Sequence, residues 1–382
     1  MEMSWYNLYP MKRARMSMRH SFFGVCIVLF PVHNSIFLQA QAVVAPATID
    51  SAAFGHSAIV GQPVFDGGGA PEYAAAVRRF EGYVVGKKPG IKNDANLPFL
   101  LSHGGKAARS ILMVHGLTDS PYYMRSLADV FYGAGYNVVS ILLPGHGTRP
   151  ENLLDVRLEQ WQAEVQFGLD IAGRLGEQVS LAGFSTGGAL VLDALAKNYA
   201  GPRPLPMGDV FLFSPALEVL DKRAPLGCSV PWLTTRLKPW KDSDPNIPED
   251  HPYRYRKFAV NAICQLYRQT LQDLLRRSDM SSDIAAHGIG VFAVQSEADE
   301  VVSAGAVVSF MNSLRPGVRN ELILYPKESG VDHTAVTRPE SNPYFGALAE
   351  RIKVFILDRG IATKPPIRFF PPRFLKDLTF DH

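Results

Sequence analysis

Short apolar runs alternate with amphipathic stretches along most of this chain. Each run holds five to seven residues rich in Val, Ile, Leu and Phe, which is typical of strands buried on both faces of a sheet. Between the runs, apolar residues recur at helical spacing. The predicted strands are residues 110–114, 137–142, 178–182, 209–213, 289–295 and 321–325, and the predicted helices include residues 71–85, 121–135 and 151–173. This alternation predicts an α/β fold with a mostly parallel central sheet and helices on both faces.

The last predicted helix has signals at both ends. Ser341 is a candidate N-cap, Pro343 fits a first turn, and Gly360 would end the helix. Between these ends, apolar residues from Phe345 to Phe355 fall on one stripe. We therefore expect a helix with one buried face in this part of the chain.

Residues 183–187 read Gly-Phe-Ser-Thr-Gly and lie between a predicted strand and a helical stretch. A serine on such a sharp turn is held out of the sheet, and the glycines beside Ser185 leave room for the neighbouring strand and helix. The N–H of Thr186 lies at the N-terminus of the helix, where negative charge is favoured. The alternative is a glycine-rich turn with an idle serine, which the placement between strand and helix disfavours.

Two further residues could activate this serine. Serine is a poor nucleophile at neutral pH and needs a base that a carboxylate orients. Asp299 follows the predicted strand 289–295, and His333 lies in the loop after strand 321–325. The carboxyl ends of parallel strands meet at one edge of a sheet, so we expect Ser185, Asp299 and His333 to lie together.

Both partners of the serine have competitors. Glu297 is the main rival of Asp299 and Glu300 a lesser one, but the two valines after residue 300 can anchor a helix start and leave the aspartate on the loop. His333 could also be an ordinary surface histidine. The other histidines considered as a base do not follow a late strand; they are His103, His115, His146, His251 and His287.

A second donor for a developing negative charge is expected in the loop after strand 110–114. Gly116 allows a sharp bend that aims the Leu117 N–H at the point that the Thr186 N–H also faces. Two such donors form an oxyanion hole, and losing one typically costs roughly a hundredfold in rate. His115, at the end of the strand, is interpreted as a residue that fixes this loop rather than as a base.

These motifs together resemble those of the α/β-hydrolases, in the group of carboxylesterases, monoacylglycerol lipases and lysophospholipases. The resemblance covers residues 97–360 and implies that Ser185, Asp299 and His333 form a catalytic triad. It also implies that Leu117 and Thr186 supply the oxyanion hole, and that no metal or organic cofactor is needed. The matching segments are residues 114–118, 143–148 and 183–188, with Asp299 and His333.

The alternation of strands and helices breaks between residues 214 and 288. The sequence is first irregular, with Trp232 and Trp240 among prolines, and then becomes amphipathic. We expect residues 215–288 to form a helical cap over Ser185 that walls an apolar acyl pocket, with most of its apolar residues buried in helix packing. The apolar residues at helical spacing are Ile263, Leu266, Tyr267, Leu271, Leu274 and Leu275.

The first 42 residues have the layout of a secretory signal. Four basic residues precede an apolar run over residues 22–30, and Ala40-Gln41-Ala42 offers a cleavage site. We therefore expect export, to the periplasm or out of the cell; the alternatives are an uncleaved membrane anchor and a later start. With this segment removed, the net charge of +3 falls to near zero, so the basic composition does not indicate nucleic-acid binding.

The mature chain would then have three parts. Residues 43–96 form an extension whose helix packs on the hydrolase body, residues 97–360 form the hydrolase domain, and residues 361–382 form a tail rich in Pro and Phe. Cys228 and Cys264 both lie in the proposed cap, but their spacing does not establish whether they pair. No cluster of Cys or His has the spacing of metal ligands.

The sequence thus predicts a serine hydrolase of carboxylic esters, with monoacylglycerol-like or lysophospholipid-like substrates and an acyl-enzyme on Ser185. Its partner is a small-molecule ester or lipid; no nucleic acid is expected, a transient contact with a membrane surface is left open, and the oligomeric state is not indicated. A serine peptidase or thioesterase with the same triad is the nearer alternative. A non-catalytic binding protein of the same fold is the more distant one.

Overall fold

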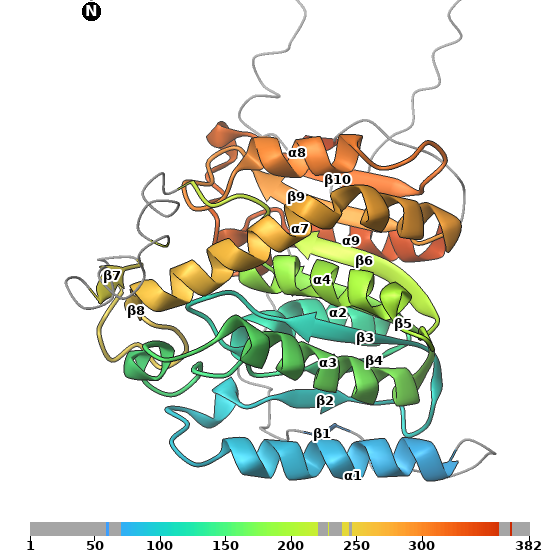
Figure 1. The fold of residues 1–382 in the computed structure, drawn as a ribbon, viewed down its shortest axis with the longest axis horizontal. Helices are drawn as coiled ribbons and strands as arrows, with labels where there is room; N and C mark the ends of the chain where they lie inside the picture. Colours follow the sequence, from blue (N-terminus) through green and yellow to red (C-terminus); the bar gives the residue numbers. More distant parts are fainter. Residues whose placement is uncertain are drawn as a thin grey trace, which may run out of the picture. The chain divides into compact units, whose positions relative to one another are not determined.

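The computed structural model describes residues 59–60, 70–220, 228, 239–243, 247–358 and 367–368 (Figure 1). The predicted secretory segment, the part of the extension before residue 59, Trp232, Gly360 and most of the tail lie outside these residues. Export therefore stays a prediction. Among the described helices, none combines the length and the apolar composition that crossing a membrane requires.

One sheet of nine strands runs through the described part of the chain, in the order β1-β2-β4-β3-β5-β6-β9-β10-β11. Every neighbouring pair is parallel except β2 and β4, which confirms the mostly parallel sheet. The six predicted strands are present, while β1, β2 and β11 have no counterpart among them. The strands are β1 (Ile59–Val60), β2 (Phe99–Leu101), β3 (Ala107–Val114), β4 (Tyr136–Ser140), β5 (Gly176–Phe184), β6 (Met207–Phe213), β9 (Val291–Ser296), β10 (Asn320–Tyr325) and β11 (Ile367–Arg368).

Helices cover both faces of this sheet (Figure 1). One layer contains α3 (Leu158–Leu175), α4 (Thr186–Ala200), α7 (Val260–Ala286) and α8 (Ala304–Asn312), with α1 (Ala70–Lys87) outside it; the other contains α2 (Arg125–Gly133) and α9 (Phe345–Leu357). Helix α1 packs against α3, as expected for the helix of the extension. Alternate residues of β3 point into the two layers, since Leu112 packs toward α3 and α4 while Met113 packs toward α2 and α9.

Two predicted helices begin later than their periodicity indicated. The stretch 121–135 opens with a 3₁₀ turn, η3 (Pro121–Met124), before α2. The stretch 151–173 opens with another, η4 (Pro150–Leu153), and α3 begins only at Leu158. There the Leu158 N–H donates to the side chain of Gln265 on α7 (3.0 Å), a tertiary cap that local periodicity does not reveal.

The prediction that Ser341 is the N-cap residue of the last helix is wrong. Helix α9 begins at Phe345, and its N-cap residue is Tyr344. The side chain of Asn342 accepts the Tyr344 N–H (2.9 Å), and the Ser341 N–H donates to the Arg338 carbonyl (3.1 Å). Ser341 therefore belongs to the turn that precedes the helix.

Helix α7 buries the predicted apolar stripe only in its first turns, where Ile263 and Leu266 are buried. Leu271, Leu274 and Leu275 are 42%, 54% and 85% exposed, whereas Gln269 and Asp273 are buried. The neighbouring helices satisfy these polar side chains and thereby decide which face is covered. Because α7 lies beside α4 in the layer over the sheet, only the residues before it and its first turns remain candidates for a cap (Figure 1).

A disulfide joins Cys228 to Cys264. Cys264 is buried on the first turns of α7, and Cys228 precedes the short hairpin of β7 (Trp240–Asp242) and β8 (Lys257–Ala259). The sequence left this pairing open. The bond attaches the segment before the hairpin to the helical layer.

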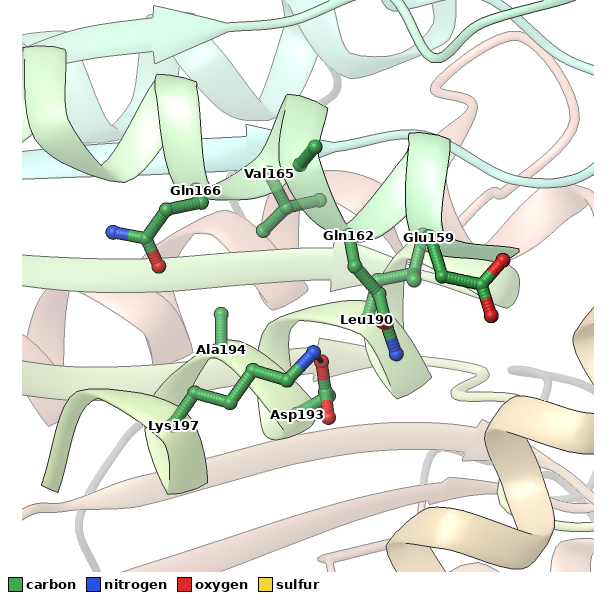
Figure 2. Close-up of a pocket in the computed structure, with 9 residues that line it drawn as sticks. Glu159, Gln162, Val165, Gln166, Leu190, Asp193, Ala194 and Lys197 are labelled. Carbon is green, nitrogen blue, oxygen red and sulfur yellow. Dashed lines mark ion pairs between the residues drawn. The ribbon is translucent and has the colours of Figure 1, made fainter. Parts of the chain in front are cut away.

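A pocket of about 280 Å³, lined by both polar and apolar side chains, lies between α3 and α4 (Figure 2). Asp193 is buried there, and it forms ion pairs with Lys197 (2.6 Å) and with Arg276 of α7 (2.8 Å). Gln162 of α3 donates to Gln269 of α7 (2.8 Å), which in turn donates to Asp273 (2.8 Å). This network explains why the polar face of α7 is the buried one.

Asp273 is expected to make stability depend on pH. Burial, and then the charge of Asp193, raise the pKa of Asp273 well above its ordinary value. The folded protein therefore keeps a proton that the unfolded chain releases above about pH 4, and stability falls as pH rises from there toward the folded pKa. Asp273→Asn should raise the free energy of unfolding at pH 7, by on the order of 1 kcal/mol, and should change this free energy little at pH 4.

Urea unfolding at both pH values measures this difference. The control is Asp279→Asn, because Asp279 is exposed on the same helix. An equal effect of Asp273→Asn at both pH values would contradict the prediction.

Candidate active site

The order of the strands places a topological switch point, the crevice of an open α/β sheet, between two loops. From β3 the chain first adds β4 on one side and later β5 on the other, and Val114 of β3 pairs with Gly183 of β5. Loops that follow such strands diverge to opposite faces, so ligands of open α/β sheets bind between them. The two loops here begin at His115 and Ser185. This is where the sequence predicted the site.

Ser185 lies buried on the turn between β5 and α4, with backbone angles φ 53° and ψ −116°. A positive φ is rare for a residue with a side chain and marks a strained turn. Backbone hydrogen bonds connect this turn to β6 and the residues after it: the Ser185 N–H donates to the Phe213 carbonyl (3.0 Å), and the Ser185 carbonyl accepts from Ala216 (2.9 Å). A Cβ on Gly187 would lie 2.6 Å from the carbonyl carbon of Val114, so only glycine fits there.

The three predicted side chains form one hydrogen-bonded chain. The Oγ of Ser185 lies 3.0 Å from Nε2 of His333, and Nδ1 of His333 lies 2.6 Å from Oδ2 of Asp299. Because the carboxylate accepts, Nδ1 carries the hydrogen and Nε2 is left to accept the serine proton. The acid in contact with the histidine is thus Asp299 and not its rivals Glu297 and Glu300.

Asp299 is held in place by several donors. Its Oδ1 accepts the N–H groups of Val301 (2.8 Å) and Val302 (2.9 Å), and its Oδ2 also accepts from Nε2 of Gln295 (2.9 Å). Burial alone would raise the pKa of Asp299, but the hydrogen bonds from His333 and the two valines hold it below its ordinary value. The carboxylate is therefore ionised at neutral pH.

The loop that carries His333 is fixed at its start. Oδ1 of Asp332 accepts the N–H groups of Thr334 and Ala335, both at 2.8 Å. The hydroxyl of Ser296, at the end of β9, donates to the carbonyl of Val331 (2.6 Å). Asp332, although adjacent to the histidine, thus stabilises the turn.

His115 fixes the loop after β3, as the sequence indicated. The Leu143 N–H donates to Nε2 of His115 (3.1 Å), so the Nδ1–H of this ring donates to the carbonyl of Gly116 (2.8 Å). Burial, then the neighbouring His146, lower the pKa of His115, which keeps the ring neutral. The C=O and N–H of a trans peptide point in opposite directions, so this contact sets the direction of the Leu117 N–H.

The next peptide of the same loop is also held. Nε2 of His146 lies 2.6 Å from the carbonyl of Leu117, and burial lowers the pKa of His146. On the other side of the crevice, Thr186 is the first residue of α4, and the first N–H groups of a helix have no partner within it. Leu117 and Thr186 therefore each offer an N–H group from a loop of the crevice.

The remaining histidines have other contacts. His103 stacks on Tyr132 with ring centroids 4.2 Å apart, and His287 stacks on Tyr199 at 3.9 Å. Nδ1 of His251 accepts the Tyr253 N–H (3.2 Å). Within the described ranges, no group of three or more His, Cys, Asp or Glu side chains is arranged to hold a metal ion.

An apolar wall lies beside Ser185. Ala189 follows it by one turn of α4, and Ala216 donates its N–H to the Ser185 carbonyl. These two alanines pack with Leu266 of α7 and Val302 of the acid loop, and Leu117 packs against the group. The wall therefore combines Ala216 and Leu266, which lie within the segment predicted as a cap, with Ala189 before that segment and Val302 after it.

Gln295 and His146 were not identified from the sequence as supporting residues. A signal for Gln295 was available, because an amide at the carboxyl end of an apolar strand is buried and needs a hydrogen-bond partner. His146 was considered as a base and as part of a matching segment, but not as a residue that supports the Leu117 loop. Its contact with Leu117 depends on how two loops meet.

A model of the alpha/beta hydrolase family matches residues 111–361. A stretch of 82 residues is 37% identical to a thermostable monoacylglycerol lipase of Bacillus sp. (strain H-257), covering 22% of this chain and only 33% of that lipase. A carboxylesterase of Bacillus subtilis (strain 168) is 23% identical over 207 residues, 54% of this chain and 77% of that enzyme.

Solved structures share the fold at low identity. One from a study of two metagenome-derived lipolytic enzymes, LipS and LipT, has a TM-score of 0.54 at 20% identity and covers 70% of this chain and 98% of its own. A soluble variant of the monoglyceride lipase of Saccharomyces cerevisiae has a TM-score of 0.50 at 15% identity, covering 70% and 92%. Since the family model spans both loops of the crevice and most of the sheet, the chain belongs to the alpha/beta hydrolase family.

Proposed function

We propose that this protein is a serine hydrolase that cleaves carboxylic esters. The observation that carries the proposal is the hydrogen-bonded chain from Ser185 through His333 to Asp299, the arrangement that a serine needs in order to attack a carbonyl carbon. An esterase or lipase activity is also supported by the names of its relatives, a monoacylglycerol lipase and a carboxylesterase.

The proposed reaction is a two-step acyl transfer. Ser185 attacks the ester carbonyl while Nε2 of His333 takes its proton, and the ionised Asp299 stabilises the resulting imidazolium. His333 then protonates the departing alcohol. In the second step His333 takes a proton from water, which attacks the acyl-enzyme. His333 then returns this proton to Oγ of Ser185 as the bond to the acyl carbon breaks and the carboxylic acid leaves.

The oxyanion of each step would be bound by the N–H groups of Leu117 and Thr186. Support comes from His115, which sets the direction of the Leu117 N–H, and from the position of Thr186 at the start of α4. Both donors are fixed before substrate binds, so little reorganisation is needed as negative charge develops.

The substrate class that fits best is an ester with an apolar acyl chain, as in monoacylglycerols or lysophospholipids. The wall of Ala189, Ala216, Leu266 and Val302 offers apolar contacts next to Ser185. A peptidase acting at N-termini would hold the substrate amine with acids of the predicted cap, where the candidates are Asp242, Asp244, Glu249 and Asp250. Asp242, Glu249 and Asp250 are exposed, as in a solvated loop, which favours the ester over the peptide; Asp244 lies outside the described residues.

The test is hydrolysis by the purified protein of p-nitrophenyl esters graded in chain length, beside aminoacyl p-nitroanilides and acyl thioesters. We expect ester hydrolysis with little anilide cleavage, and a fluorophosphonate adduct that mass spectrometry locates on the peptide containing Ser185. Faster turnover of anilides or thioesters would replace the ester proposal by one of those classes. Absence of both turnover and labelling would support a non-catalytic binding protein.

A further inference from the structure

A buried ion pair joins the two loops on which the proposed chemistry depends. Nη2 of Arg338 donates to Oδ1 of Asp119 at 3.1 Å. Asp119 belongs to the loop after β3 that contains Leu117, and Arg338 follows His333 by five residues. The two residues are only 3% and 6% exposed, so water screens their interaction little.

The acidic member of the pair, Asp119, packs against the peptide that holds the proposed oxyanion donor, Leu117. Oδ2 of Asp119 lies 3.3 Å from where a Cβ of Gly116 would be, and the Asp119 N–H donates to the Gly116 carbonyl (3.3 Å). The same carbonyl accepts from His115. The Asp119 carboxylate thus abuts the peptide whose N–H belongs to Leu117.

The basic member of the pair, Arg338, contacts both loops: its side chain reaches the loop of Asp119, and its backbone belongs to the loop of His333. The guanidinium of Arg338 lies 3.7 Å from the ring centroid of Tyr123, on the 3₁₀ turn after Asp119. The backbone of Arg338 ends the 3₁₀ turn η6 (Ala335–Thr337), and its carbonyl accepts from Ser341 and Asn342. Arg338 therefore holds its own loop and reaches across to the other.

We propose that the Asp119–Arg338 pair is a positioning device that sets the distance between His333 and the oxyanion donor of Leu117. The inference rests on the proposed function, in which both groups must contact one tetrahedral intermediate. The hydrogen bond to Asp299 and the contacts of Asp332 orient His333 within its loop, whereas Asp119 and Arg338 link that loop to the loop of Leu117. Displacement of such groups by about 1 Å can cost roughly a hundredfold in rate.

The test compares four variants in ester hydrolysis: Arg338→Met, Arg338→Lys, Asp119→Asn and the double variant Asp119→Asn/Arg338→Met. Arg338→Met should lower kcat by roughly tenfold to a hundredfold with KM within about twofold, because the defect lies in the transition state. Affinity for an alkyl trifluoromethyl ketone, which forms a tetrahedral adduct on serine, should fall in parallel. Arg338→Lys should lose less, since its ammonium keeps an attachment to Asp119.

The double variant separates positioning from stability. Removing both charges relieves the unpaired carboxylate that Arg338→Met leaves buried, so the double variant should be more thermostable than the single one. Its kcat should nevertheless stay as low, because the link between the loops is still missing. Recovery of kcat together with stability would overturn the proposal.

Arg351→Met is the matched control. Arg351 forms a pair with the buried Glu321 (2.6 Å) near the amino end of β10, at the opposite edge of the sheet from Ser185. Its loss should lower the melting temperature and leave kcat unchanged. If Arg338→Met resembled this control, with lower stability and a normal kcat, the pair would be structural only.

A wild-type protein that neither hydrolyses esters nor reacts with fluorophosphonate would instead overturn the proposed function, and the inference with it.

Discussion

Replacing Ser185 with alanine is expected to lower ester hydrolysis by about 10⁴-fold or more and to abolish fluorophosphonate labelling. The variant keeps the fold, because alanine also carries a Cβ and so leaves the backbone strain at φ 53° unchanged. The measurements are kcat on a p-nitrophenyl ester, labelling by mass spectrometry and circular dichroism. Normal hydrolysis by a folded Ser185→Ala protein would remove Ser185 from the mechanism.

The stability of a second variant at the same position measures the backbone strain of the turn. Glycine adopts positive φ freely, so Ser185→Gly should be more stable than Ser185→Ala by about 1 kcal/mol. Both variants should be equally inactive, since each lacks the hydroxyl. Equal stability of the two would mean that the turn carries no strain. A difference in the expected direction would show that stability is given up at this position to direct the side chain toward His333.

The core of the fold and the three hydrogen-bonded side chains followed from the sequence because both depend on local pattern and simple topology. Short apolar runs identify the buried strands, and parallel strands have their carboxyl ends at one edge. Ser185, Asp299 and His333 each follow such a run. Once the strands were known, little freedom remained for where these residues lie.

Helix α7 shows where local pattern fails. The predicted apolar stripe is buried in the first turns of the helix. Beyond them the helix exposes Leu271, Leu274 and Leu275, and it buries Gln269 and Asp273 instead. The spacing of apolar residues indicates which face of a helix is buried when no neighbouring element offers hydrogen-bond partners to its polar residues. Here α3 and α4 supply hydrogen-bond partners for the polar face, and no window of the α7 sequence contains that information.

The ion pair between Asp119 and Arg338 was beyond sequence reasoning for a related cause. Its members are 219 residues apart, and each reads as an ordinary charged loop residue. Only the folded sheet brings the loop after β3 and the loop after β10 together, at the carboxyl ends of their strands. Residues that act on the reaction through other residues are therefore harder to find from one sequence than those that act directly.

Asp299→Asn is expected to be nearly as damaging as loss of the nucleophile, lowering kcat by about 10⁴-fold with little change in KM. The reason lies in the donors around the carboxylate. Oδ1 accepts two backbone N–H groups, from Val301 and Val302, so the amide oxygen of the asparagine takes that place. Its NH₂ group then occupies the place of Oδ2, facing Nδ1 of His333 and the Gln295 amide.

In that orientation the asparagine donates to Nδ1 and stabilises the wrong tautomer of His333. The ring hydrogen moves to Nε2, which faces the Ser185 hydroxyl at 3.0 Å and no longer accepts its proton. The matched controls are Glu297→Gln and Glu300→Gln, which neutralise the neighbouring acids on the same loop and should keep near wild-type kcat. A normal rate for Asp299→Asn with a large loss in either control would assign the orienting acid to that glutamate. Because only the tautomer of His333 and the charge beside it change, Asp299→Asn should retain the hydroxyl, the oxyanion donors and the affinity for substrate while losing the base.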